Sequence, residues 1–131
     1  MTDFKGYKKG INLGGWLSQC CHTKEHYDSF ITEADIRKIS DWKADHVRLP
    51  IDYNLIQDEN GNFIEDGFAY IDSAVKWSRN AGLNVIIDLH KTAGFSFDKG
   101  ENESGFFENP TLQERFYKLW EYIAQRYAVS D

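Results

Sequence analysis

Three stretches of the chain have the apolar composition of buried strands, and helical patterns separate them. The stretches are GINLGGW at residues 10–16, ADHVRLP at 44–50 and NVIIDLH at 84–90. A β-α-β-α-β-α order predicts a parallel sheet with helices packed on its outside. Functional side chains in such folds collect at the carboxyl ends of the strands. The candidate polar residues there are Asn12, Arg48 and His90.

Apolar residues at helical spacing fill the intervals between these strands. The three expected helices begin near Thr32, at Phe68 and at Pro110. Thr32 is a suitable N-cap, and Gly82 is expected to end the second helix. Proline is well tolerated in the first turn, as at Pro110. The third helix has the longest apolar stripe, which comprises Leu112, Phe116, Leu119, Trp120, Ile123 and Tyr127.

Alternation of side chains predicts which residues face the interior of the sheet. His46 and Arg48 share one face of the second strand, and Asp88 and His90 share one face of the third. The opposite faces are apolar, so helices are expected to pack against them. Arg48 and His90 are therefore expected side by side on the inner face. A buried arginine needs a partner, which is either Asp88 in a fold-stabilising pair or a catalytic carboxylate whose pKa Arg48 would lower.

Composition indicates one globular unit over residues 1–131. A hydrophobic content of 41% supplies one core, and a net charge of −6 disfavours nucleic acid as a partner. No apolar run approaches the length of a membrane span, and residues 1–10 lack the apolar segment of a signal peptide. Cys20 and Cys21 are adjacent, with Cα atoms about 3.8 Å apart, which is too close for an ordinary disulfide. A reducing, cytoplasmic location is favoured.

The histidines and their neighbouring carboxylates show no metal-ligand spacing, so neither a metal nor a cofactor is expected. The aromatic residues near the strand ends have two interpretations, as walls of a sugar-binding cleft or as packing. For Trp16 a place in the core is favoured over contact with substrate. Packing is also favoured for a group of loop residues, namely His26, Tyr27, Phe30, Phe95, Phe97, Phe106 and Phe107.

Three motifs carry a family resemblance. GINLGGWL, HVRLP and VIIDLHKTAGFSFD, in this order and spacing, resemble the first three βα units of glycoside hydrolase family 5. The resemblance runs from about Gly10 to Tyr127. It implies an α/β fold that is the N-terminal half of a TIM (β/α)8 barrel, with parallel strands and outer helices. Members cleave β-glycosidic bonds with retention, using an acid/base glutamate in an Asn-Glu-Pro motif after the fourth strand and a nucleophilic glutamate after the seventh.

Neither glutamate motif is expected in this chain, since Asn102-Glu103 lacks both the proline and a preceding strand. By the resemblance, Arg48 matches the arginine that hydrogen-bonds the nucleophile, and His90 matches a histidine that contacts sugar. Asn12 and Trp16 are further candidates for substrate contact. Of the remaining carboxylates near strand ends, Asp52 is expected to be solvated. Glu108 is expected to lie at the start of a helix, where negative charge is favourable.

Two hypotheses about function follow. In the first, the chain is the N-terminal half of a hydrolase that cleaves β-1,4-glucan, and is inactive alone; a parent acting on mannan, xyloglucan or β-1,3-glucan is an alternative. In the second, it is a non-catalytic half-barrel or a sugar-binding remnant. The expected partner is a β-linked oligosaccharide or polysaccharide, and the open sheet edges are expected to cause self-association.

Overall fold

The three strands form one parallel sheet in the order β1-β2-β3. The computed structural model describes residues 4–100 and 102–128; the first three residues of the polar N-terminal stretch, residue 101 of the glycine-rich loop and residues 129–131 lie outside the described residues. The strands are β1 at Gly10–Asn12, β2 at His46–Asp52 and β3 at Asn84–Lys91. The predicted parallel arrangement is confirmed, with Asn12 opposite Arg48 in the register.

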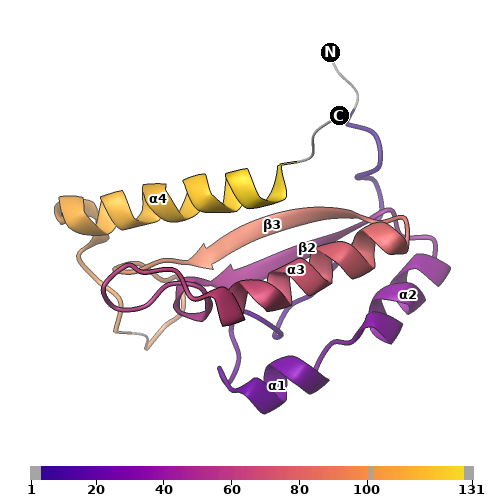
Figure 1. Cartoon of the computed structure of the whole chain (residues 1–131), viewed down its shortest axis with the longest axis horizontal. Helices are drawn as coiled ribbons and strands as arrows, with labels where there is room; N and C mark the ends of the chain where they lie inside the picture. Colours follow the sequence, from indigo (N-terminus) through magenta and orange to yellow (C-terminus); the bar gives the residue numbers. More distant parts are fainter. Residues whose placement is uncertain (1–3, 101, 129–131) are drawn as a thin grey trace.

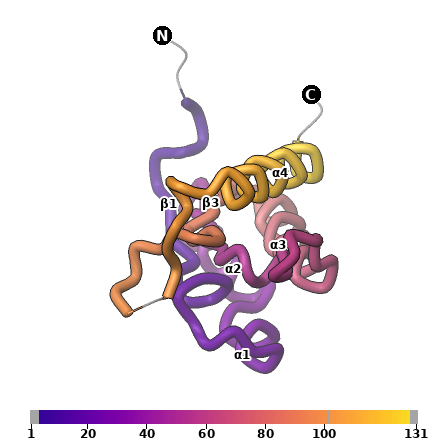
Figure 2. The backbone as a smooth tube through the Cα atoms, turned by 90° about the vertical axis from the view of Figure 1, so that its left-hand side faces the viewer, coloured from indigo at the N-terminus to yellow at the C-terminus, as the bar shows by residue number. Residues whose placement is uncertain are grey.

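Helices separate the strands and cover one side of the sheet. In the end-on view of Figure 2, α3 and α4 lie to the right of β1 and β3. Thr32 caps α2 as expected, and its backbone N–H donates to the Asp35 carboxylate at 2.8 Å. The helical elements are α1 at Lys24–Ser29, α2 at Glu33–Asp41, the 3-10 turn η1 at Tyr53–Leu55, α3 at Glu65–Asn80, the 3-10 turn η2 at Phe106–Glu108 and α4 at Pro110–Tyr127 (Figure 1).

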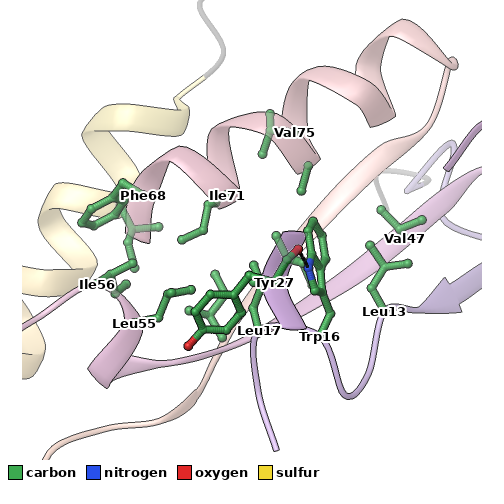
Figure 3. Close-up of a cluster of buried hydrophobic side chains, with 14 of the residues drawn as sticks. Leu13, Trp16, Leu17, Tyr27, Val47, Leu55, Ile56, Phe68, Ile71 and Val75 are labelled. Carbon is green, nitrogen blue, oxygen red and sulfur yellow. Dashed lines mark hydrogen bonds between the residues drawn. The ribbon is translucent and has the colours of Figure 1, made fainter. Parts of the chain in front are cut away.

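The hydrophobic core lies between the sheet and these helices. Side chains from one face of β2, from α3 and from α4 form a single buried cluster, part of which Figure 3 shows. Each large apolar side chain buried there contributes about 1.5–3 kcal/mol relative to exposure. Arg48 and Asp88 lie on the opposite face and are only partly buried. The predicted inward phase of Arg48 and His90 is therefore confirmed.

The strand boundaries differ from the sequence prediction chiefly after Asn12 and at Pro50. β1 ends at Asn12 rather than at residue 16, and β2 continues through Pro50 to Asp52. The N–H of Leu13 donates to the carbonyl of Arg48, and the N–H of Asp52 donates to the carbonyl of Leu17. Pro50 falls between these bonds, where the chain after β1 has left the sheet. Its missing N–H therefore costs no ladder bond, and the proline does not end the strand.

Two helices also differ from the prediction. The segment 17–31, expected to be a loop, contains the six-residue α1, whose N-cap Thr23 accepts a hydrogen bond from the N–H of His26 at 3.2 Å. α3 begins at Glu65 instead of Phe68 because acidic residues favour a first turn. Close packing against η1 explains the glycine in this turn: a Cβ at Gly67 would lie 1.8 Å from the Leu55 carbonyl oxygen.

Candidate active-site edge

A row of four polar side chains crosses the inner face of the sheet towards the carboxyl ends of its strands. Arg48 Nη1 donates to Asn12 Oδ1 at 2.8 Å, and Arg48 Nη2 donates to Asp88 Oδ2 at 2.5 Å. The same Asp88 oxygen lies 3.0 Å from His90 Nδ1. We call Asn12, Arg48, Asp88 and His90 the polar row. It joins all three strands through charge-assisted contacts.

Asp88 is the partner of Arg48 in this chain, which is the first of the two alternatives drawn from the sequence. Because an ionised carboxylate only accepts hydrogen bonds, its contact with His90 is a bond donated by Nδ1–H. That contact fixes the imidazole ring and leaves Nε2 for another partner. The Arg48 side chain keeps 40% of its surface exposed, so it remains accessible for a second acidic group.

A second network surrounds Asp52, at the end of β2. Its carboxylate accepts hydrogen bonds from Ser18 Oγ at 2.7 Å, from the Gln19 N–H at 3.2 Å and from His22 Nε2 at 2.9 Å. The other ring nitrogen of His22 lies 2.6 Å from the Tyr27 hydroxyl. This Asp52 network fastens the segment after β1 to the end of β2.

Asp52 is 2% exposed, so the expectation that it is solvated was wrong. The reason is that β2 passes through Pro50 and carries Asp52 under the segment after β1. Burial alone would raise the pKa of Asp52, but the bonds from His22, Ser18 and Gln19 outweigh it and lower the pKa. Asp52 is thus an ionised structural anchor at neutral pH.

The neighbouring thiol and phenol are held in their neutral forms. Burial, and then the charge of Asp52, raises the pKa of Cys20 to about 11. Burial is also the main cause that raises the pKa of Tyr27 to about 12. Cys20 consequently lacks the thiolate that a nucleophile needs. In the described part of the chain, no three His, Cys, Asp or Glu side chains form a group that could hold a metal ion.

Three further residues considered from the sequence are Trp16, Glu108 and Glu103. Trp16 is buried in the core, where its indole N–H donates to the Tyr27 carbonyl at 2.9 Å, the dashed line of Figure 3. Glu108 is exposed in η2, next to the start of α4. Glu103 lies in the loop after β3 and accepts bonds from the Tyr53 hydroxyl at 2.5 Å and from the Gly94 N–H at 2.8 Å. It holds that loop together.

Sequence reasoning missed the Asp52 network. The sequence did contain a signal for this network. If β2 passes through Pro50, the alternation of side chains along a strand puts Arg48, Pro50 and Asp52 on the same face. Gln19 was also missed. Its side chain donates to Asp98 at 2.7 Å across 79 residues of sequence, and no periodic pattern reports such a contact.

A parallel βα sheet with polar side chains gathered towards the carboxyl ends of its strands is the arrangement found in (β/α)8-barrel enzymes. The chain belongs to the family of cellulases known as glycosyl hydrolase family 5, whose model matches residues 5–131. This confirms the resemblance carried by the three strand motifs.

Relatives named as β-glucan-cleaving enzymes match nearly the whole chain. It is 60% identical over 127 residues to Cellodextrinase A of Ruminococcus flavefaciens, covering 97% of this chain and 38% of that protein. It is 45% identical over 124 residues to Endoglucanase C of Acetivibrio thermocellus, covering 92% of this chain and 36% of that protein. The chain therefore spans less than two fifths of the length of these relatives.

Solved structures show the same fold. A glycoside hydrolase family 5 enzyme of Prevotella bryantii, crystallised with a xyloglucan tetradecasaccharide, superimposes with a TM-score of 0.73 at 24% identity, covering 96% of this chain and 39% of that one. Cel5A of Thermotoga maritima, in complex with cellobiose, gives a TM-score of 0.70 at 24% identity, with 93% and 38% covered. Among residues 4–100 and 102–128, no helix is both long and apolar enough to cross a membrane.

Proposed function

We propose that this chain is the N-terminal part of a retaining hydrolase of β-1,4-glucan, and that it supplies the polar row of the active site. The observation that supports this most is the linkage of Asn12, Arg48, Asp88 and His90 on the open face of the sheet. Relatives named cellodextrinase and endoglucanase favour a cellulose-like substrate over mannan or β-1,3-glucan.

Arg48 and His90 each have a defined role in this proposal. Arg48 donates to Asp88 and Asn12 and keeps exposed surface, so it can hold a nucleophilic glutamate ionised and aimed. His90, fixed through Nδ1, offers Nε2 to a sugar hydroxyl. The acid/base and nucleophilic glutamates are supplied by chain beyond these 131 residues. A retaining mechanism places their carboxyl groups about 5–5.5 Å apart.

The two aspartates at the ends of β2 and β3 are already engaged in other contacts. Asp88 contacts Arg48 and His90, and Asp52 is buried under three donors with a lowered pKa. A general acid requires a raised pKa instead. The 131-residue chain is therefore proposed to have no hydrolytic activity alone.

A hybrid enzyme tests this proposal. It joins residues 1–131 to the part of the R. flavefaciens cellodextrinase that follows its matched segment. The hybrid is expected to hydrolyse cellopentaose with retention of the anomeric configuration, measured by NMR, and the chain alone is expected to release no sugar. A folded hybrid that cleaves only mannan or β-1,3-glucan would overturn the proposed β-1,4-glucan substrate. A folded hybrid that cleaves none of these would favour the non-catalytic alternative.

A further inference from the structure

An open groove lies in the helical layer, between α1 and the first half of α3. Figure 1 shows these two helices beside each other, with α1 below the start of α3. The groove has a volume of about 740 Å³, within the range of about 300–1,000 Å³ that small-molecule sites occupy. The polar row lies on the other, inner face of the sheet. We call this feature the outer groove; it is lined chiefly by Tyr27, Asn54, Leu55, Asp66, Tyr70 and Ser73.

The floor of the outer groove is apolar and firmly packed. Leu55 and Tyr27 are both buried and belong to the hydrophobic core. Tyr70 of α3 forms one side, with its ring centroid 5.1 Å from that of Tyr27. The Tyr70 hydroxyl donates to the Asp28 carboxylate of α1 at 2.8 Å, which holds the ring between the two helices. The groove therefore offers a preformed aromatic and aliphatic surface.

The rim of the groove carries polar side chains that are free to bind a ligand. Asn54 lies in η1, and Asp66 and Ser73 lie seven residues apart on α3, which is about 10 Å along the helix axis. In the described part of the chain, the side chains of these three residues have no hydrogen-bond partner. Asn54 and Ser73 can each donate and accept, and an ionised Asp66 accepts. Such a set matches sugar hydroxyl groups, each of which is both a donor and an acceptor.

The charges around the groove favour a neutral ligand over an anionic one. Lys24, which also lines the groove, already forms an ion pair with Asp28. Asp66 has no ion pair among the described residues. An anion would therefore meet a negative charge and no free positive one, which disfavours nucleotides and acidic peptides. A second copy of this chain, with a net charge of −6, is disfavoured for the same reason.

We propose that the outer groove is a second binding site for a β-1,4-glucan chain, separate from the active-site edge. The proposal rests on the proposed function, which supplies the glucan, and adds to it a site on the helical layer. The apolar faces of the sugar rings cover the tyrosines of the floor, and their hydroxyls bond the polar rim. Because the groove and the polar row lie on different sides of the sheet, the groove retains polymer without contacting the bond that is cleaved. It therefore affects long substrates and leaves short ones unaffected.

Obstruction of the groove in the hybrid enzyme tests the proposal. Ala69 is exposed on α3 and lines the groove, so Ala69→Arg adds a long side chain there, which Asp66 three residues earlier can pair with. Hydrogen–deuterium exchange with a non-hydrolysable thio-linked cellopentaose is expected to show protection of residues 65–73 in the parent hybrid. Ala69→Arg is expected to weaken that protection about tenfold in ligand concentration. Ala34→Arg, the same change at an exposed position of α2, is the matched control and should keep it.

The rim is tested by shortening side chains that hold no other part of the protein. Asn54→Ala and Ser73→Ala each remove a hydrogen-bonding group without a protein partner, so the melting temperature is expected to stay unchanged. Each variant is expected to weaken the protection of residues 65–73 roughly two- to tenfold, the effect of one hydrogen bond. In the same variants kcat and KM for cellopentaose are expected to stay at the parent values, while hydrolysis of dilute hydroxyethylcellulose slows. Unchanged protection in both variants would overturn the proposal.

Failure of the second site can be told apart from failure of the proposed function. A hybrid that hydrolyses cellopentaose, with ligand protection confined to β2 and β3, keeps the function and overturns the outer groove. If the hybrid is inactive, the same exchange measurement on the 131-residue chain decides: protection of residues 65–73 that Ala69→Arg abolishes supports the groove, and its absence overturns it. A change in oligomeric state with Ala69→Arg, without protection by the glucan, would assign the groove to a second copy and overturn the proposal.

Discussion

Arg48 and His90 are joined through a single oxygen atom, Asp88 Oδ2, which lies 2.5 Å from Arg48 Nη2 and 3.0 Å from His90 Nδ1. The two side chains come from neighbouring strands and do not depend on direct contact with each other. Their positions are coupled because one carboxylate orients both. A change at any of the three residues is therefore expected to affect the other two.

Arg48→Ala in the hybrid enzyme is expected to lower kcat on cellodextrins far more than it raises KM. Losing a charge-assisted hydrogen bond that strengthens in the transition state costs about 1.5–3 kcal/mol, roughly ten- to a hundredfold in rate. Steady-state kinetics on cellopentaose measure this. Arg37→Ala, at an exposed position of α2, is the control and should leave kcat and KM unchanged. A large KM effect with unchanged kcat would contradict the role assigned to Arg48.

His90→Ala is expected to act mainly on KM, because the imidazole would contact sugar hydroxyls in the ground state as well as in the transition state. The same assay separates the two constants. If kcat falls as far as in Arg48→Ala while KM is unchanged, His90 takes part in the chemical step and its assignment to substrate binding fails.

Asp88→Asn is expected to combine both effects, lowering kcat and raising KM. An amide presents one acceptor oxygen and no charge, so it cannot hold Arg48 and His90 as the carboxylate does. A double-mutant cycle with Arg48→Ala measures the coupling. Additive losses, with no interaction free energy, would mean that Asp88 does not orient Arg48.

Asp52→Asn is expected to destabilise the chain by about 2–4 kcal/mol at pH 7, since Ser18, Gln19 and His22 lose a charged acceptor. The folded-state pKa of Asp52 is lowered. The stabilisation is therefore fully present above the unfolded pKa of about 3.9 and is lost as the pH falls through the folded pKa. Urea denaturation followed by tryptophan fluorescence should show variant and parent converging below about pH 4. Asp41→Asn, on exposed α2, is the control.

The isolated 131-residue chain is expected to self-associate. In the described residues β1 and β3 are sheet edges, and Ile11 and Ile86 are 38% and 40% exposed on opposite faces of the sheet. Unpaired edges and exposed apolar surface favour pairing between copies. Ile86→Lys should shift light-scattering chromatography towards monomer, and Ala34→Lys on α2 should not. A sharp monomer peak for the parent chain with a cooperative thermal transition would contradict this expectation.

The fold followed from the sequence wherever one period dominates a segment. Alternation along β2 and β3 placed Arg48, Asp88 and His90 on one face, and the apolar stripe of α4 was long enough to define the helix from Pro110 to Tyr127. The six-residue α1 was missed because a short polar helix has almost no periodicity to detect. Pro50 caused the end of β2 to be predicted too early. Whether a proline ends a strand depends on whether a neighbouring strand needs a hydrogen bond from the N–H at that position.

The candidate site was predictable only as far as neighbouring strands bring residues together. Predicting the polar row requires one inference, namely that the carboxyl ends of parallel strands lie at the same edge of the sheet. The Asp52 network and the Gln19–Asp98 bond depend on how the loops fold back over that edge. Such contacts are set by loop geometry and not by a repeating pattern. The favoured interpretation of Phe97 and Phe107 as packing residues does not hold, since they are 80% and 70% exposed, and this exposure could not be derived from their apolar character alone.

The spacing of the polar row along the chain bears on how the site is built during synthesis. Arg48 is 36 residues from Asn12 and 40 residues from Asp88, so each link closes over one βα unit. Chains that fold as they emerge from the ribosome gain contacts from the N-terminus onwards, and loops of this length are modest in entropic cost. The row can therefore form as soon as β3 has emerged. In the longer hydrolase that we propose, it would already be in place when the catalytic glutamates are synthesised.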